Sequence, residues 1–246
     1  MTADLSAVLA ARPGWFALAC AATAILSYFF GCFNGAVVVS RYILRNDVRA
    51  HGSGNAGLTN FHRVFGGPLT ALVILSDVVK AVAATLFTAW IMSLLAPGLA
   101  IFGKYWAGLF CLVGHMFPCM FQFRGGKGIL SGGAMAIVID WRIALIVWGG
   151  FLLLAIFTRY VSLGSCYAAA AFPVATAIFY PDAVLILLAV VIGGLILWKH
   201  RSNIKRLISG TESKFSLHKK SPPPEPPAAG EGDAPAASEE TEAKGK

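Results

Sequence analysis

Residues 68–95 read PLTALVILSDVVKAVAATLFTAWIMSLL, an apolar run that contains only two charged side chains, Asp77 and Lys80. A helix needs about 20 apolar residues to cross the hydrocarbon core of a bilayer, and this run is long enough. Six further apolar runs lie at about 15–42, 105–121, 129–138, 143–157, 161–179 and 183–198. The sequence therefore predicts an all-α integral membrane protein with seven transmembrane helices.

The composition supports this class. Of the 246 residues, 57% are hydrophobic and only 13% are charged, against about 25% charged in soluble domains. Seven of the twelve acidic residues lie at or after Glu212, so the membrane body lacks the material for paired-carboxylate catalysis. The net charge of +8 favours anionic partners, either the headgroups of the lipid bilayer or a phosphorylated substrate. The basic residues are dispersed, which argues against nucleic acid.

The five cysteines are odd in number and form no C-x-x-C pair, so we expect small buried hydrophobes and no disulfide framework or metal site. The small residues at 20–24 resemble a signal-peptide cleavage site. Because the apolar run continues to about residue 39, we expect a retained first span instead. From residue 213 to 246 the sequence turns rich in Pro, Ala, Glu and Lys. We therefore expect a membrane domain over 1–212 and a disordered cytoplasmic tail over 213–246.

The fourth and fifth runs are short, and Asp140-Trp141-Arg142 between them resembles a charged hairpin tip at the membrane interface. Counting these two runs as separate helices gives seven spans, with the N-terminus outside and the C-terminus in the cytoplasm. This orientation places most Lys and Arg residues of the loops inside, as the positive-inside rule requires. It also places three polar stretches on the cytoplasmic face of the membrane.

The first polar stretch, residues 51–60, reads HGSGNAGLTN. Its glycines permit positive φ and expose backbone N–H groups to an anion, although such a cluster is also typical of a plain turn. Arg63 follows ten residues after Ser53, and its planar guanidinium suits bidentate phosphate binding. A positive-inside anchor is the alternative for Arg63.

The second stretch contains Gly125-Gly126-Lys127-Gly128 at the start of a helical run. Free N–H groups, the helix dipole and an ammonium together favour anion binding. Phe121 and Gly128 do not fit a Walker A loop, so no nucleotide is implied. His115, inside the preceding apolar run, is interpreted as a hydrogen-bonded structural histidine.

The third stretch, residues 199–212, places His200 and Asn203 on one helix face at i, i+3 spacing, with headgroup anchoring as the alternative. Asp77 and Lys80 have the same spacing inside an apolar run, where charges are costly, and we expect a structural pair. Ser162 and Ser165 follow a loop at the same face. Either they donate hydrogen bonds to a phosphate or they cap a helix.

Three motifs in this order resemble the bacterial acyl-phosphate:glycerol-3-phosphate acyltransferases, the PlsY family. The matching residues are Gly52-Ser53-Gly54-Asn55 with Gly57, Thr59-Asn60 and Arg63; Gly114-His115, Phe117-Pro118, Phe121, Phe123 and Gly125-Gly126-Lys127-Gly128; and His200, Asn203-Ile204, Arg206-Leu207 and Gly210-Thr211-Glu212. The resemblance covers about residues 28–212. It implies seven helices and transfer of a fatty acyl group from acyl phosphate to the sn-1 hydroxyl of glycerol 3-phosphate, giving lysophosphatidic acid and inorganic phosphate.

By position, the resemblance assigns catalytic roles to Ser53, His200 and Asn203 and a structural role to Glu212. It assigns substrate or phosphate binding to Asn55, Arg63, Gly125, Gly126, Lys127 and Gly128, which Ser162 and Ser165 would join. Acyl phosphate is an activated anhydride, so the enzyme needs mainly to align two anions and neutralise developing charge. The proton of the attacking hydroxyl goes either to His200 or to a substrate phosphate, and the donor chain is expected to enter laterally from the membrane.

The chain departs from the family pattern at Leu58 and Leu130, where small residues are usual, and at Asn34, Ala81 and Lys199. The two leucines bear on acyl-chain preference. No cofactor and no metal are expected, because no His, Cys and carboxylate cluster is evident. A transporter for a small phosphorylated solute is the alternative function, and a membrane scaffold is a third. A transporter would carry polar residues from one membrane face to the other.

Overall fold

The structure is a computed structural model that describes residues 1–215. Its described residues form helices and short helical turns, with no strand. In chain order these are α1 (Thr2–Ala11), α2 (Pro13–Cys32), α3 (Gly35–Val38), η1 (Val39–Ile43), η2 (Val48–Ala50), α4 (Leu58–Val64), α5 (Leu69–Leu95), η3 (Pro97–Leu99), α6 (Ala100–Met116), η4 (Cys119–Phe121), α7 (Ile129–Ile139), α8 (Trp141–Thr158), α9 (Val161–Phe179), α10 (Ala183–Lys199) and α11 (Arg201–Ile208).

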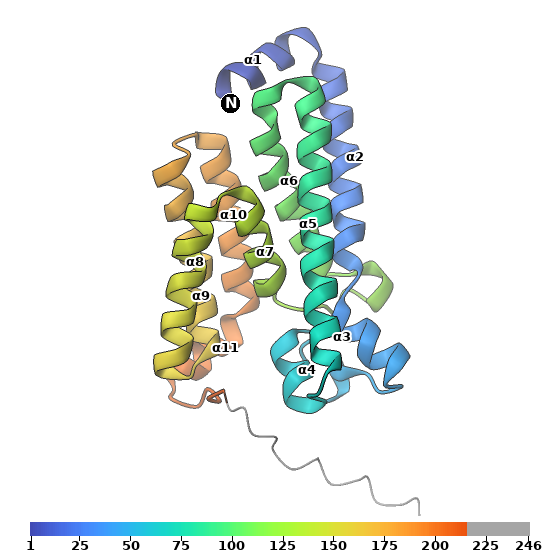
Figure 1. Cartoon of the computed structure of the whole chain (residues 1–246), viewed down its shortest axis with the longest axis vertical. Helices are drawn as coiled ribbons and strands as arrows, with labels where there is room; N and C mark the ends of the chain where they lie inside the picture. The colour runs from blue at the N-terminus through green and yellow to red at the C-terminus, as the bar shows by residue number, and fades with distance from the viewer. Residues whose placement is uncertain (216–246) are drawn as a thin grey trace, which may run out of the picture.

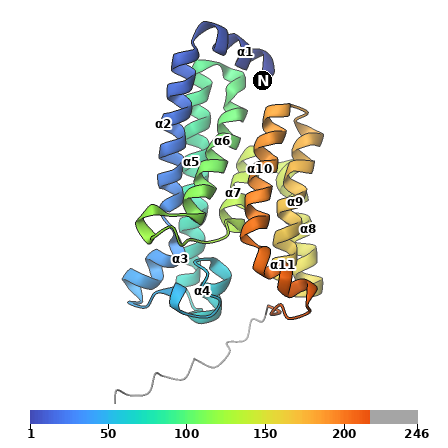
Figure 2. The ribbon, with the colours of Figure 1, turned by 180° about the vertical axis from the view of Figure 1, so that it is seen from behind.

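The long helices form two groups that run side by side (Figures 1 and 2). One group contains α2, α5 and α6, which all pack on one another, and the other contains α8, α9 and α10. The short helix α7 packs against both α5 and α8, and α10 packs on α6. The two groups are therefore joined through α7 and through the contact of α10 with α6, and the polar stretches lie toward their lower ends (Figure 1).

Close packing within the first group depends on two glycines. A Cβ at Gly31 of α2 would meet the backbone carbonyl of Cys111, and one at Gly114 of α6 would meet the carbonyl of Tyr28. Because glycine has no Cβ, the backbones of α2 and α6 approach each other closely, as small residues allow between membrane helices. Across the groups, the buried hydroxyls of Tyr105 and Thr176 are hydrogen-bonded at 3.0 Å. These contacts fix the helices that carry the polar stretches.

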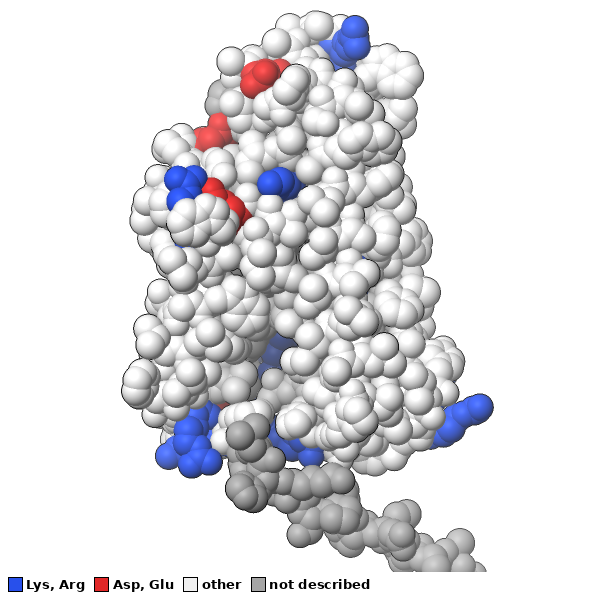
Figure 3. Space-filling model, in the orientation of Figure 1, with Lys and Arg blue, Asp and Glu red and all other residues white. Residues whose placement is uncertain are grey.

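The outer surface is apolar, as expected for a protein in lipid. Large hydrophobic side chains such as Trp90, Leu145 and Phe157 are exposed on the long helices. Figure 3 shows a broad uncharged band between charged groups nearer the two ends. Within the described residues, five helices are long and apolar enough to cross a membrane, or six if α10 and α11 count as one bent span. The all-α membrane class is confirmed.

The predicted number of seven spans is not confirmed. The fourth predicted span corresponds to α7, whose 11 residues extend about 16 Å, roughly half of the hydrocarbon core. It remains separate from α8, as expected, because Asp140 ends one helix and caps the next by accepting from the N–H of Arg142 at 2.8 Å. Lys104 donates to the carbonyl of Val138 at 2.7 Å, which satisfies the end of α7.

The three polar stretches meet at one end of the bundle. There α2 ends, Asn34 caps α3, and the chain folds into α3, η1, η2 and α4. On the other side, α10 and α11 are bent by 61° next to His200. Which face of the membrane this end occupies, and where the chain termini lie, stay predictions. Of the predicted tail, residues 213–215 are described, and residues 216–246 lie outside the described part of the chain.

Candidate active site

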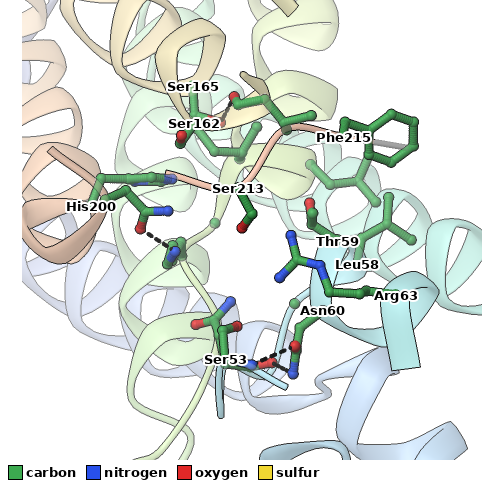
Figure 4. A pocket seen from close by; sticks show the side chains of 18 of the residues that line it. Ser53, Leu58, Thr59, Asn60, Arg63, Ser162, Ser165, His200, Ser213 and Phe215 are labelled. Atoms are coloured by element: carbon green, nitrogen blue, oxygen red, sulfur yellow. Dashed lines mark hydrogen bonds between the residues drawn. The ribbon is translucent and has the colours of Figure 1, made fainter. Parts of the chain in front are cut away.

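A pocket of about 560 Å³ lies between the two helix groups at this end. Its lining includes most of the residues singled out in the sequence, among them Ser53, Asn55, Arg63, Asp77, Lys127, Gly128, Ser162, Ser165, His200, Asn203 and Glu212. Figure 4 shows Ser53 and Arg63 on one side, with His200, Ser162 and Ser165 opposite.

The loop over residues 51–60 is organised by Asn60, which the sequence marked only as part of a motif. The buried Asn60 amide accepts from the N–H of Ser53 at 2.9 Å. It also donates to the carbonyls of Val48, His51 and Asn55. One amide thus closes the loop from inside and leaves the Ser53 side chain toward the pocket (Figure 4).

Gly52 is required in this loop for two reasons. Its φ is +58°, in the left-handed region that favours glycine. A Cβ there would also meet the side-chain oxygen of Asn60. The loop therefore has one defined conformation. Its position is fixed further by Asn34, whose amide donates to the carbonyl of Ala56 at 3.0 Å.

The glycine loop packs against the end of α6. The N–H groups of Gly125 and Gly126 donate to the carbonyls of Met116 and His115. In this structure these two donors are satisfied within the chain, and their binding of a substrate phosphate stays a prediction. A Cβ on Gly126 would meet the ring of His115 and the carbonyl of Ala56. The glycines let this loop lie against the end of α6, and they thereby place Lys127 and Gly128 at the pocket.

Lys127 begins a chain of polar contacts across the pocket. Its ammonium donates to the side-chain oxygen of Asn203. Asn203 in turn donates to Glu212 at 2.7 Å, and Glu212 also accepts from Arg206 at 2.6 Å. Burial, together with the nearby Arg206, lowers the pKa of Lys127 to about 8. Glu212 thus holds Asn203, and Asn203 holds Lys127, while the structural role of Glu212 stays a prediction.

His200 is buried and oriented by the backbone. Its Nδ1 lies 2.8 Å from the carbonyl of Ile196. A carbonyl only accepts, so Nδ1 carries the proton, and in the neutral ring Nε2 is left with a lone pair. The ring points into the pocket in Figure 4. This tautomer can accept a proton from a hydroxyl bound there.

The two serines differ. Ser165 donates to the carbonyl of Val161 at 2.8 Å, which is an ordinary contact of a helical serine with the backbone one turn earlier. The Ser162 hydroxyl is buried, lines the pocket and interacts with the Glu212 carboxylate. Ser162 is a candidate to donate to a ligand in the pocket.

Beneath the pocket lies a buried ionic cluster. Asp77 and Lys80 form the expected ion pair, at 2.7 Å, and Lys80 also lies 2.8 Å from Nδ1 of His115. Lys80 donates to the carbonyl of Phe33 at 2.8 Å as well, where α2 ends. An ammonium only donates, so Nδ1 of His115 accepts and its Nε2 carries the proton. The cluster fixes α2, α5 and α6 together, and His115 is hydrogen-bonded as predicted.

One side of the pocket is apolar. It is lined by Leu58, Leu130, Trp148, Phe151 and Val161. The Trp148 indole donates to the carbonyl of Gly133 at 3.1 Å and packs edge-on against Phe151. Figure 3 shows a hollow on the lateral face in which a basic side chain is recessed. Both leucines that depart from the family pattern therefore face the pocket.

The sequence missed one residue that joins two of the stretches. Arg49 pairs with Asp47 at 2.7 Å and donates to the carbonyl of Phe121 at 2.8 Å. It thus ties the first loop to the second, and only its closeness to Asp47 signalled it. No group of three or more metal-ligating side chains occurs among residues 1–215.

The fold and the site define an integral membrane protein with a polar, cationic pocket at one end of an apolar helical bundle. The family model described as glycerol-3-phosphate acyltransferase matches residues 21–210. The chain therefore belongs to the glycerol-3-phosphate acyltransferase family, as its motifs predicted.

Individual relatives carry the same name. Over 193 residues the chain is 37% identical to the glycerol-3-phosphate acyltransferase of Thermoanaerobacter pseudethanolicus, covering 78% of this chain and 94% of the relative. It is 36% identical to that of Pseudomonas aeruginosa, over 78% and 97% of the two chains. A crystal structure of PlsY, an integral membrane glycerol 3-phosphate acyltransferase in its glycerol 3-phosphate form, has a TM-score of 0.72 and 29% identity. The match covers 80% of this chain and 96% of the PlsY chain.

Proposed function

We propose that this protein transfers a fatty acyl group from acyl phosphate to the sn-1 hydroxyl of glycerol 3-phosphate, with lysophosphatidic acid and inorganic phosphate as products. The observation that carries the proposal is one pocket that combines two cations, Arg63 and Lys127, with the neutral His200 and an apolar wall. The related PlsY structures in glycerol 3-phosphate and lysophosphatidic acid forms support the acceptor and the product.

The residues fit the chemistry as follows. Arg63 and Lys127 neutralise the two phosphates, and Ser53 and Ser162 donate hydrogen bonds to them. The sn-1 oxygen attacks the acyl carbonyl carbon, the bond from that carbon to the phosphate oxygen breaks, and phosphate leaves. The hydroxyl proton passes to Nε2 of His200 and from there to the released phosphate. Asn203 keeps Lys127 in place through the contact described above.

The apolar wall gives the acyl chain its place. Trp148, Phe151 and Val161 line the pocket, and the lateral face of the molecule has a hollow (Figure 3). A chain dissolved in the bilayer reaches the pocket from this side without crossing water, so its apolar surface stays buried. The soluble acceptor then enters from the cytoplasm, at the end that carries the loops. We accordingly place the protein in a bacterial inner membrane with its site and C-terminus on the cytoplasmic side.

The test is an assay of the purified protein in detergent with acyl phosphate and labelled glycerol 3-phosphate, without added cofactor or metal. We expect labelled lysophosphatidic acid and one phosphate released per product. Product formed equally well from acyl-CoA alone, or no product at all, would overturn the proposal. A chelator is expected to leave the rate unchanged. The position of the acyl group in the product, read by mass spectrometry, tests the sn-1 assignment.

A further inference from the structure

Residues 213–215, here called the strap, run from the end of the α11 region across the mouth of the pocket. Ser213 and Phe215 both line it. In Figure 4, Ser213 lies between His200 and Arg63, and Phe215 lies on the far side, next to the first helix group. The family match ends at residue 210, so the strap is outside the part of the chain that the family model describes.

The strap is held at both ends. Upstream, Glu212 is fixed by Asn203 and Arg206. Downstream, the N–H of Phe215 donates to the carbonyl of Arg159 at 2.8 Å, and the Arg159 guanidinium donates back to the Phe215 carbonyl at 3.3 Å. These contacts fix the strap to the second helix group.

Phe215 contacts helix α4, which packs on α5 of the first group. The ring of Phe215 stacks on His62 of α4 at a centroid distance of 6.1 Å and an interplanar angle of 26°. His62 precedes Arg63, the cation on that side of the pocket. The strap thus bridges the two helix groups directly over the site. One stacked pair is easily separated, so a soluble substrate can enter when it opens.

Closure matters for this reaction because water competes with the acceptor. Acyl phosphate reacts with water as it does with a hydroxyl: a water oxygen bonds to the acyl carbon, phosphate leaves, and a fatty acid is released. Excluding water from a closed site is a general way to suppress such a side reaction.

We propose that the strap determines specificity for the acceptor over water, with the Phe215–His62 stack as the contact that closes it over bound glycerol 3-phosphate. Phe215 and His62 are then positioning residues and do not touch the reacting atoms. The proposal rests on the proposed function for its substrates, although closure of the strap can be measured without turnover.

The first test uses full-length Phe215→Ala, Phe215→Trp, His62→Ala and the double alanine variant. We expect Phe215→Ala to raise the ratio of fatty acid to lysophosphatidic acid at least about fivefold and to raise KM for glycerol 3-phosphate more than it lowers kcat. Phe215→Trp keeps an aromatic ring and is expected to stay near wild type. The double variant is expected to be no worse than Phe215→Ala, because both single changes break one contact.

Tyr42→Ala is the matched control. Tyr42 is 60% exposed on η1, at the same end of the molecule but outside the pocket lining. It is expected to leave both the product ratio and KM unchanged. A product ratio in Phe215→Ala equal to that of wild type, with comparable thermal stability, would overturn the strap proposal.

The second test follows trypsin cleavage between Lys214 and Phe215 by mass spectrometry, without acyl phosphate. We expect glycerol 3-phosphate to slow this cleavage in wild type at least about threefold and to have little effect in Phe215→Ala. Equal cleavage rates in wild type and Phe215→Ala, with and without glycerol 3-phosphate, would overturn the strap proposal. If glycerol 3-phosphate slows cleavage of a wild-type protein that makes no lysophosphatidic acid, the proposed function is wrong. The strap proposal is then retained.

Discussion

The backbone N–H of Ser53 donates to the side-chain oxygen of Asn60 at 2.9 Å, while the nitrogen of the same amide donates to three carbonyls. A residue seven positions away thus decides where Ser53 lies. The loop has two glycines with positive φ, Gly52 and Gly54, and would otherwise have many conformations.

Replacement of Asn60 tests this relationship. Asn60→Ala removes all four bonds, and Asn60→Asp keeps only the acceptor and places a negative charge beside three carbonyls. Each unsatisfied buried group costs about 1–3 kcal/mol. We expect both variants to lower kcat/KM at least about tenfold and to unfold at lower temperature. Thr59→Ala, next to Asn60 but exposed, is the control for folding, and unchanged stability in Asn60→Ala would contradict the role.

Lys127 predicts a pH dependence. Its pKa in the folded protein is about 8, below its ordinary value of 10.5. Below pH 8 the ammonium is charged and holds an anion; above pH 8 it becomes neutral, so kcat/KM for glycerol 3-phosphate is expected to fall as pH rises through about 8. Lys127→Arg stays charged and is expected to remove this falling limb, which a pH series from about 6.5 to 9.5 measures.

The same shift has a consequence for stability. Between pH 8 and 10.5 the unfolded chain binds a proton at Lys127 that the folded protein does not. The free energy of unfolding contributed by this group therefore rises with pH in that window and is constant below it. The comparison of wild type with Lys127→Met by thermal unfolding at pH 7 and pH 9.5 checks the sign. A gap between the two proteins that does not change with pH would contradict the shift.

Gly126 and Gly132 form a matched pair for substitution. A Cβ on Gly126 would meet the His115 ring and a backbone carbonyl, whereas the nearest atom to one on Gly132 is 3.6 Å away. We expect Gly126→Ala to displace Lys127 and to reduce activity at least about tenfold. Gly132→Ala, inside helix α7, is expected to keep full activity and to gain up to about 1 kcal/mol. Equal effects of the two substitutions on turnover would refute the packing argument.

The buried pair of Asp77 and Lys80 makes a prediction about stability. Lys80→Met leaves Asp77 charged and unpaired in an apolar environment, which costs about 3–5 kcal/mol. The double variant Asp77→Asn/Lys80→Met removes both charges and is expected to recover most of that loss. Thermal unfolding in detergent measures both, and a double variant as unstable as the single one would show that the charge is not the cause.

His200 is tested by its effect on kcat. Loss of a general base lowers the rate by about 10²–10⁴, so His200→Ala is expected to reduce kcat in that range with a smaller change in KM. A reduction below about threefold would show that the proton passes to a substrate phosphate instead. Ser165→Ala, which removes only a contact to the carbonyl of Val161, is the control on the same side of the pocket.

The all-α membrane class and the family could be predicted from local sequence. Apolar runs that are long enough to cross a bilayer indicate a membrane protein directly, because length and hydropathy are the properties that a helix in lipid must have. The motif residues Ser53, Arg63, Lys127, His200 and Asn203 were recognisable by type and spacing, and all five line one pocket. The pairing of Asp77 with Lys80 followed from the cost of isolated charges in an apolar run.

Only the tertiary structure decided how those residues are held. Gly125 and Gly126 resemble anion donors in the sequence, but their N–H groups bond to the end of α6, since a backbone donor has no preference between a ligand and a nearby carbonyl. The contacts of Asn60 and Phe215 were equally hidden. Each depends on contacts between residues distant in the chain, and a local pattern carries no information about which distant group will satisfy a donor.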